Sequence, residues 1–138
     1  MPIMEPVGKR KLGGSKHLEK DSVVNPCLDY FWRNGFEVLG YKANKPIRDL
    51  PAHGGVVWRQ NTGSIKLGGR YVRFGVVGGS DIMGWTPAGK FLAIEAKRPG
   101  ATLKPEQQAF LDRLRFAGGV GLVVRRLQDL IDQWEQIR

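Results

Sequence analysis

Two carboxylates and a lysine lie close together in the middle of the chain. Glu95 and Lys97 are two residues apart in the β-rich segment 91–97, so a strand places both side chains on one face. The turn over residues 86–89 joins this segment to a second one that begins at Asp81. If that turn sets the register, Asp81 pairs directly with Glu95, and directly paired residues on antiparallel strands lie about 5 Å apart on the same face.

Two carboxylates this close repel each other unless a cation lies between them. Two carboxylates, with water filling the remaining positions, provide the oxygen ligands that Mg²⁺ prefers. Lys97 then adds a positive charge where a phosphate oxygen would bind beside the metal. The spacing therefore predicts a metal–phosphate site at Asp81, Glu95 and Lys97, with a plain Glu–Lys pair at an exposed strand end as the alternative.

Two further polar residues fall on helix faces that are otherwise apolar. Gln107 follows Leu103 by four residues in a helix predicted over 105–116. It is either a core glutamine bonded to backbone or a residue that points at the strand ends and positions the lysine or a water. Glu19 precedes Val23 by four residues, so a continuous first helix turns it toward the core, whereas a frayed first turn leaves it in solvent.

The helices and strands that the sequence pattern predicts around these residues form one α/β domain. Residues 1–16 hold five prolines and glycines without apolar periodicity, which predicts a flexible basic arm and leaves 17–138 as a single domain. Strands are predicted over 55–60, 71–77, 81–85, 90–97 and 120–124, and helices over 18–33, 105–116 and from 127 onward. The first helix either kinks at Pro26 or begins there, and residues 36–54 predict an irregular loop. The expected order is roughly α-β-β-β-α-β-α, a mixed central sheet flanked by helices.

Charge favours an acidic partner. The chain has 22 Lys and Arg against 13 Asp and Glu, a formal net charge of +9, and no acidic residue lies between Asp49 and Asp81. Nucleic acid is the first candidate, and an anionic membrane is a distant one because no predicted helix carries a dense basic face. The candidate DNA contacts are Arg59, Asn61, Lys66, Arg70, Arg73, Arg98, Lys9, Arg10 and Lys11.

Several classes of protein are excluded by composition. Cys27 is the single cysteine, so an intrachain disulfide and an all-cysteine zinc site are impossible, and the two histidines are too few for a histidine-based metal site. No segment approaches the roughly 20 apolar residues that cross a bilayer, and the basic N-terminus lacks the apolar run of a secretory signal. These features predict a cytoplasmic protein.

The motifs, taken in order, resemble the virus-type replication-repair nuclease (VRR-NUC) family of the PD-(D/E)XK nuclease superfamily. The resemblance is carried by Gly79-Ser80-Asp81, by Ile94-Glu95-Ala96-Lys97-Arg98-Pro99 and by Gln107 four residues after Leu103. The segment 58–63 is similar to the family's strand and turn upstream of the acid, and 117–124 also matches. The resemblance covers roughly residues 55–126. The chain departs from the pattern at Pro26 and in the long stretch between Gly35 and Trp58.

This resemblance implies a nuclease fold and a metal-dependent endonuclease that hydrolyses phosphodiester bonds. It implies that Asp81 and Glu95 bind Mg²⁺ or Mn²⁺ with the Ala96 carbonyl as a third ligand, and that Glu19 is the acidic residue of the first helix. Lys97 is then the catalytic lysine and Gln107 its supporting polar residue.

Free-standing, phage-type members of this size resemble Holliday junction resolvases and form homodimers. Branched DNA and a homodimer are therefore expected, in phage or mobile-element replication and repair in the cytoplasm of a bacterial host. The alternatives are a nuclease for flaps, nicks or unspecific duplex, and a DNA-binding module that does not cleave. An exposed interface is expected at Trp32, Phe36, Leu39 and Tyr41, unless these residues fold back under the 36–54 loop.

Overall fold

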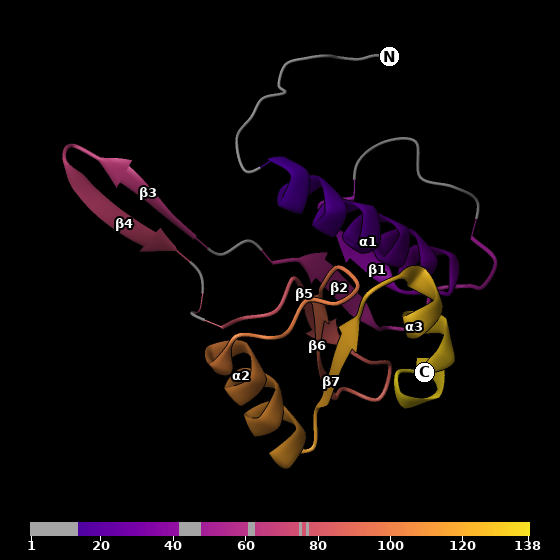
Figure 1. The fold of residues 1–138 in the computed structure, drawn as a ribbon. Helices are drawn as coiled ribbons and strands as arrows, with labels where there is room; N and C mark the ends of the chain where they lie inside the picture. Colours follow the sequence, from indigo (N-terminus) through magenta and orange to yellow (C-terminus); the bar gives the residue numbers. More distant parts are fainter. Residues whose placement is uncertain (1–13, 42–47, 61–62, 75, 77) are drawn as a thin grey trace, which may run out of the picture.

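A computed structural model describes residues 14–41, 48–60, 63–74, 76 and 78–138, with backbone alone for 14–20, 63–65 and 72–74. The elements are α1 (Gly14–Arg33), β1 (Glu37–Leu39), β2 (Val56–Arg59), β3 (Gly63–Leu67), β4 (Arg70–Phe74), β5 (Ile82–Trp85), β6 (Phe91–Ala96), α2 (Pro105–Phe116), β7 (Val120–Val124) and α3 (Leu127–Asp132), followed by a 3₁₀ turn, Trp134–Gln136 (Figure 1). The predicted α/β class is confirmed.

Five strands form one mixed sheet in the order β1-β2-β5-β6-β7. The central pairs β2–β5 and β5–β6 are antiparallel, whereas the outer pairs β1–β2 and β6–β7 are parallel. Strands β3 and β4 form a separate hairpin that projects away from this sheet (Figure 1). The predicted order was wrong in its strand count, because β1 lies inside the expected loop 36–54 and β3 lies between the strands predicted over 55–60 and 71–77.

The turn between β5 and β6 sets their register through local contacts. Thr86 donates its backbone N–H to the Lys90 carbonyl at 2.9 Å, and its Oγ1 accepts the Lys90 N–H at 3.1 Å. Gly89 closes the turn with φ of +86°, a left-handed conformation that favours glycine. The strands then pair from Trp85 with Phe91 to Ile82 with Ile94, which is the predicted register.

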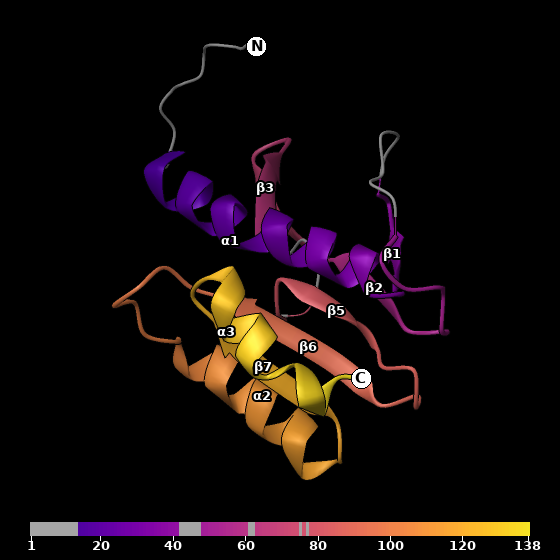
Figure 2. The ribbon, with the colours of Figure 1, turned by 90° about the vertical axis from the view of Figure 1, so that its right-hand side faces the viewer.

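Helices cover the sheet from both sides. α1 and α2 lie on opposite sides of β5 and β6 (Figure 2), and α3 packs on β7 and α1. Ile82, Ile94 and Leu122 belong to the main core with the apolar face of α1. β7 contacts both α2 and α3, and four of its five residues are buried. None of the helices in the described ranges has the length and apolar character needed to cross a membrane.

α1 continues through Pro26, so the alternative in which the helix begins there was wrong. A proline in a helix interior costs about 3 kcal/mol because a backbone hydrogen bond is lost. Buried apolar side chains on both sides of Pro26 offset this cost: Val24, Cys27 and Phe31 are fully buried, and each large apolar side chain contributes about 1.5–3 kcal/mol. Pro26 itself lies on the exposed side of the helix.

The predicted exposed interface was wrong for Phe36 and Trp32. Phe36 is fully buried, and its ring meets the ring of Phe31 edge-on at 4.8 Å between centroids. Trp32 is partly buried between the ring of Tyr41, at 5.7 Å, and the guanidinium of Arg48, which lies 3.7 Å from the Trp32 ring centroid.

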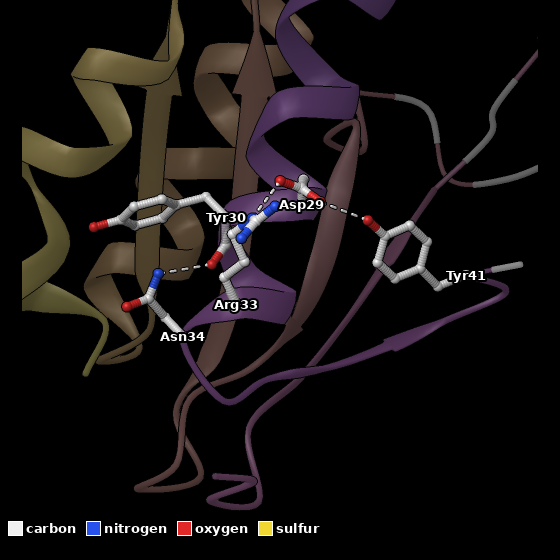
Figure 3. A network of polar contacts seen from close by, with 5 residues as sticks. All are labelled: Asp29, Tyr30, Arg33, Asn34 and Tyr41. Carbon is white, nitrogen blue, oxygen red and sulfur yellow. Dashed lines mark hydrogen bonds and ion pairs between the residues drawn. The ribbon is translucent and has the colours of Figure 1, made fainter. Parts of the chain in front are cut away.

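Tyr41 also folds back on α1 instead of lying on an open surface. Its hydroxyl donates to Asp29 Oδ1 at 2.8 Å, and Asp29 Oδ2 accepts from Arg33 Nε at 2.9 Å (Figure 3). Of the four residues predicted to form the interface, only Leu39 lies largely in solvent, with 50% of its surface exposed. The alternative of residues folding back is therefore confirmed for Trp32, Phe36 and Tyr41.

Candidate active site

Asp81 lies at the end of the β5–β6 ladder where the chain enters β5. Its Oδ2 accepts the backbone N–H of Ala96 at 2.8 Å, and its carbonyl accepts the N–H of Gln60 at 2.7 Å. Continuing the register of Ile82 with Ile94 by one residue sets Asp81 opposite Glu95. The structure thus brings Asp81 to the strand segment that carries Glu95 and Lys97.

Glu95 is a buried carboxylate, with 1% of its surface exposed, on the face of β6 that α2 covers. Its Oε2 accepts a hydrogen bond from Gln107 Nε2 at 3.1 Å. Gln107 Oε1 in turn accepts the N–H of Lys104 at 2.9 Å, which also caps the N-terminus of α2. A buried charge is costly unless it is hydrogen-bonded, so Gln107 holds Glu95 in place. Gln107 thus points at the strand end that carries Glu95, as predicted, and its two side-chain partners are Glu95 and the backbone of Lys104.

Basic residues line a hollow next to this site. Lys97 follows β6, is half-buried, and donates its backbone N–H to Val124 at 2.9 Å, which extends the β6–β7 pairing. The hollow has a volume of about 510 Å³ and is lined by Ala96, Lys97, Arg98, Gly100, Ala101, Thr102 and Lys104. Three of these side chains are cationic and none is acidic, so the hollow suits an anion such as a phosphate.

The glycines before Asp81 have a structural role. In the structure Gly78 has φ of +81°, and a Cβ at this position would lie 2.4 Å from the Glu106 carbonyl oxygen. Gly78 therefore allows the segment before Asp81 to pack against the first turn of α2, which carries Gln107.

An ion pair that sequence reasoning missed connects α1 to the same edge of the sheet. Arg59 Nη2 at the end of β2 contacts Asp21 Oδ1 on α1, and both side chains are partly buried. The pair joins residues 38 positions apart, so no local pattern in the sequence indicates it. Arg59, predicted to contact DNA, has a protein partner. Glu19 lies two residues earlier in α1, and its side chain is outside the described residues.

The other predicted DNA contacts are distributed over several elements. Lys66 and Arg70 are exposed on the β3–β4 hairpin, and Arg98 is exposed beside the hollow. Arg73 belongs to β4, with its side chain outside the described part. Asn61, Lys9, Arg10, Lys11 and the predicted arm up to residue 13 also lie outside the described residues.

The donor set at the site fits a hard cation. Asp81 and Glu95 supply carboxylate oxygens, the Ala96 carbonyl belongs to the same strand segment, and no sulfur or imidazole group is part of the set. Among the described side chains, no group of three or more His, Cys, Asp or Glu gathers into a metal cluster. A cation here would therefore complete its coordination with carbonyl, water and phosphate oxygens, as Mg²⁺ commonly does.

The segment that carries these residues was compared with known families. Residues 69–125 match the VRR-NUC domain. The match runs from the β3–β4 turn to the end of β7 and contains Asp81, Glu95, Lys97 and Gln107. It confirms the resemblance seen in the motifs over this segment, and VRR-NUC domains are nucleases. No curated protein and no solved structure matches the chain.

Proposed function

We propose that the chain is a metal-dependent DNA endonuclease that hydrolyses phosphodiester bonds at Asp81, Glu95 and Lys97. The observation that carries this proposal is the 2.8 Å hydrogen bond from the Ala96 N–H to Asp81 Oδ2. It locks one carboxylate to the strand between the second carboxylate and the lysine. The match of residues 69–125 to the VRR-NUC domain supports the same chemistry.

Asp81, Glu95 and the Ala96 carbonyl would hold Mg²⁺ or Mn²⁺, with Glu19 as the candidate from α1. When bound, the metal polarises the scissile phosphate and lowers the pKa of a coordinated water. Gln107 fixes the carboxylate of Glu95 through its amide, and the Ala96 N–H fixes that of Asp81. Preorganised ligands of this kind avoid a reorganisation cost during reaction.

Lys97 and its neighbours act on the substrate anion. Lys97 stands at the end of β6 beside the basic hollow, where its compact charge stabilises the phosphate or orients the water. Arg98 and Lys104 line the same hollow and contact the flanking phosphates. The role of Lys97 requires only that the DNA backbone cross the sheet edge at the end of β6.

The proposed substrate is branched DNA of the Holliday junction type, cut by a homodimer. A four-way junction has two-fold symmetry, and paired cuts across it need two sites in matching orientation, whereas one chain carries one site. Such an activity would serve replication and repair of a phage or mobile element in a bacterial cytoplasm. Cleavage of flaps, nicks or plain duplex, and DNA binding without cleavage, are the alternatives that the experiment separates.

The test is incubation of the purified protein with Mg²⁺, Mn²⁺ or EDTA and end-labelled four-way junction, flap, nicked and linear duplex. We expect metal-dependent cuts, fastest on the junction and symmetric across it. Equal rates on all four DNAs would contradict the preference for branched DNA but not the nuclease activity. No cut in any DNA with either metal would contradict the nuclease. Light scattering should give about 31 kDa, twice the 15.4 kDa of one chain, and a mass near 15.4 kDa would contradict the homodimer.

A further inference from the structure

The β3–β4 hairpin is rooted at the catalytic edge of the sheet. Gln60, three residues before β3, donates its N–H to the carbonyl of Asp81, seven residues after β4. The chain therefore leaves the sheet beside Asp81, runs out and back through the hairpin, and returns to the site. Figure 1 shows the hairpin projecting from the body of the molecule on this side. DNA bound at the site thus lies within reach of the hairpin.

The tip of the hairpin presents cations beside exposed apolar groups. Lys66 pairs with Tyr71 and Leu67 pairs with Arg70, on opposite faces of the ribbon because adjacent residues alternate. Each face of the tip therefore has one cation and one apolar side chain. Tyr71 is 74% exposed and Leu67 56% exposed, and Lys66 Nζ lies 6.0 Å from the centroid of the Tyr71 ring.

The charge of the hairpin fits nucleic acid. Residues 63–74 contain Lys66, Arg70 and Arg73 and no acidic residue. The positive charge of this segment therefore attracts DNA phosphates, and no acidic side chain within it repels them.

The exposed Tyr71 ring indicates which kind of DNA the tip fits. A ring of this kind gains affinity by stacking on a base, worth about 1–3 kcal/mol per base. In intact duplex both faces of each base are already stacked on neighbours. A base face becomes available where the strands branch, end or bend, so an exposed ring on a basic arm selects disrupted DNA.

We propose that the β3–β4 hairpin is a substrate-recognition arm whose Lys66 and Arg70 bind phosphates and whose Tyr71 stacks on a base exposed at a strand branch. This inference rests on the proposed function and adds the element that selects the DNA structure. Five residues of strand span about 17 Å at 3.4 Å each, so the hairpin is long enough to contact DNA beyond the cut phosphate.

The experiment measures binding to a fluorescent four-way junction and to linear duplex in EDTA, so that no cleavage occurs. Tyr71→Ala should weaken junction binding by about 5- to 100-fold and duplex binding by less than about twofold, because no base face is open there. Tyr71→Phe keeps the ring and should keep the junction preference. Phe116→Ala, which removes a 95% exposed ring on α2, is the matched control and should change neither affinity.

A second pair of variants tests the phosphate contacts. Lys66→Gln and Arg70→Gln should each reduce the slope of log affinity against log salt by about one on both DNAs. Lys90→Gln, an exposed lysine at the opposite end of β5–β6, should leave the slope unchanged.

The outcomes distinguish failure of the recognition-arm proposal from failure of the nuclease proposal. All the hairpin residues tested are exposed, so matching thermal melts will show that each variant is folded. An unchanged ratio of junction to duplex affinity in Tyr71→Ala would overturn the proposed role of the hairpin without affecting the proposed nuclease activity. Wild-type protein that binds neither DNA would overturn the proposed function and the arm together.

Discussion

Gln107 joins the buried carboxylate of Glu95 to the first turn of α2. Its Nε2 donates to Glu95 Oε2 at 3.1 Å, and its Oε1 accepts the N–H of Lys104 at 2.9 Å. One amide therefore stabilises a charge on the sheet and an end of the helix at the same time. This contact ties the geometry of the site to the docking of α2.

Gln107→Leu should lose both functions. Removing a donor to a buried charged group costs about 1–3 kcal/mol, so the melting temperature should fall. The cleavage rate at saturating DNA should fall about tenfold or more, with the DNA dissociation constant unchanged, because the substituted residue positions Glu95. Gln108→Leu is the matched control, since Gln108 bonds only the exposed Asp112 at 2.9 Å among the hydrogen bonds of the described side chains. Equal stability and rate in the two variants would refute the role of Gln107.

The Asp21–Arg59 ion pair should couple α1 to the sheet. Both groups are partly exposed, at 25% and 32%, so the pair is expected to contribute about 0.5–1 kcal/mol to the free energy of unfolding. Urea unfolding of Asp21→Asn, Arg59→Gln and the double variant measures this coupling. We expect the double variant to be about as stable as either single one. Strictly additive losses would show that the two side chains act independently.

Tyr41 should make stability depend on pH in the alkaline range. Burial and, next, the hydrogen bond to Asp29 raise the pKa of Tyr41 from 10.0 to about 12 (Figure 3). The folded chain therefore keeps the hydroxyl protonated while the unfolded chain loses the proton above pH 10, so stability falls as the pH rises through that range. Tyr41→Phe should cost about 1 kcal/mol near pH 8, and the gap to wild type should shrink above pH 10.

The check is urea unfolding of wild type and Tyr41→Phe from pH 8 to 11, with Tyr30→Phe as control. Tyr30 lies on α1 and packs its ring edge-on against Trp134 at 4.8 Å, so its variant tests the loss of a tyrosine hydroxyl elsewhere in the chain. A gap between wild type and Tyr41→Phe that stays constant up to pH 11 would contradict the assignment.

The thiol of Cys27 should be unreactive in the folded chain. Burial and, to a smaller extent, the charge of Asp129 raise the pKa of its thiol from 9.0 to about 12, and the thiolate is the reactive form. A disulfide reagent such as dithionitrobenzoate should label the native protein only at the rate of unfolding. In urea, labelling should be complete within the time of mixing. Rapid labelling of native protein at pH 8 would show that the α1 side of the core opens.

Local chemistry explains which elements were predictable. The β5–β6 register follows from contacts within one turn, between Thr86 and Lys90, so the sequence was sufficient to place Asp81 opposite Glu95. Helical spacing was likewise sufficient to turn Gln107 inward, because the period of α2 is a local property.

Long-range pairing explains what was missed. β1 has three residues and forms only by parallel pairing with β2, far along the chain, so its sequence carries no strand signal of its own. The Asp21–Arg59 pair depends on how α1 lies on the sheet. β3 did have a signal, since Gly68 and Gly69 form the glycine pair typical of a tight hairpin, with φ of +56° and +80°.

The central claim is that Asp81, Glu95 and Lys97 form one nuclease site. The most direct measurement is cleavage of a labelled four-way junction with Mg²⁺ by wild type, Asp81→Asn, Glu95→Gln and Lys97→Ala, alongside DNA affinity in EDTA. The account predicts that each variant loses cleavage while binding DNA within a few-fold of wild type, because phosphate contacts elsewhere carry most of the affinity. Wild-type cleavage by any of the three variants would contradict it.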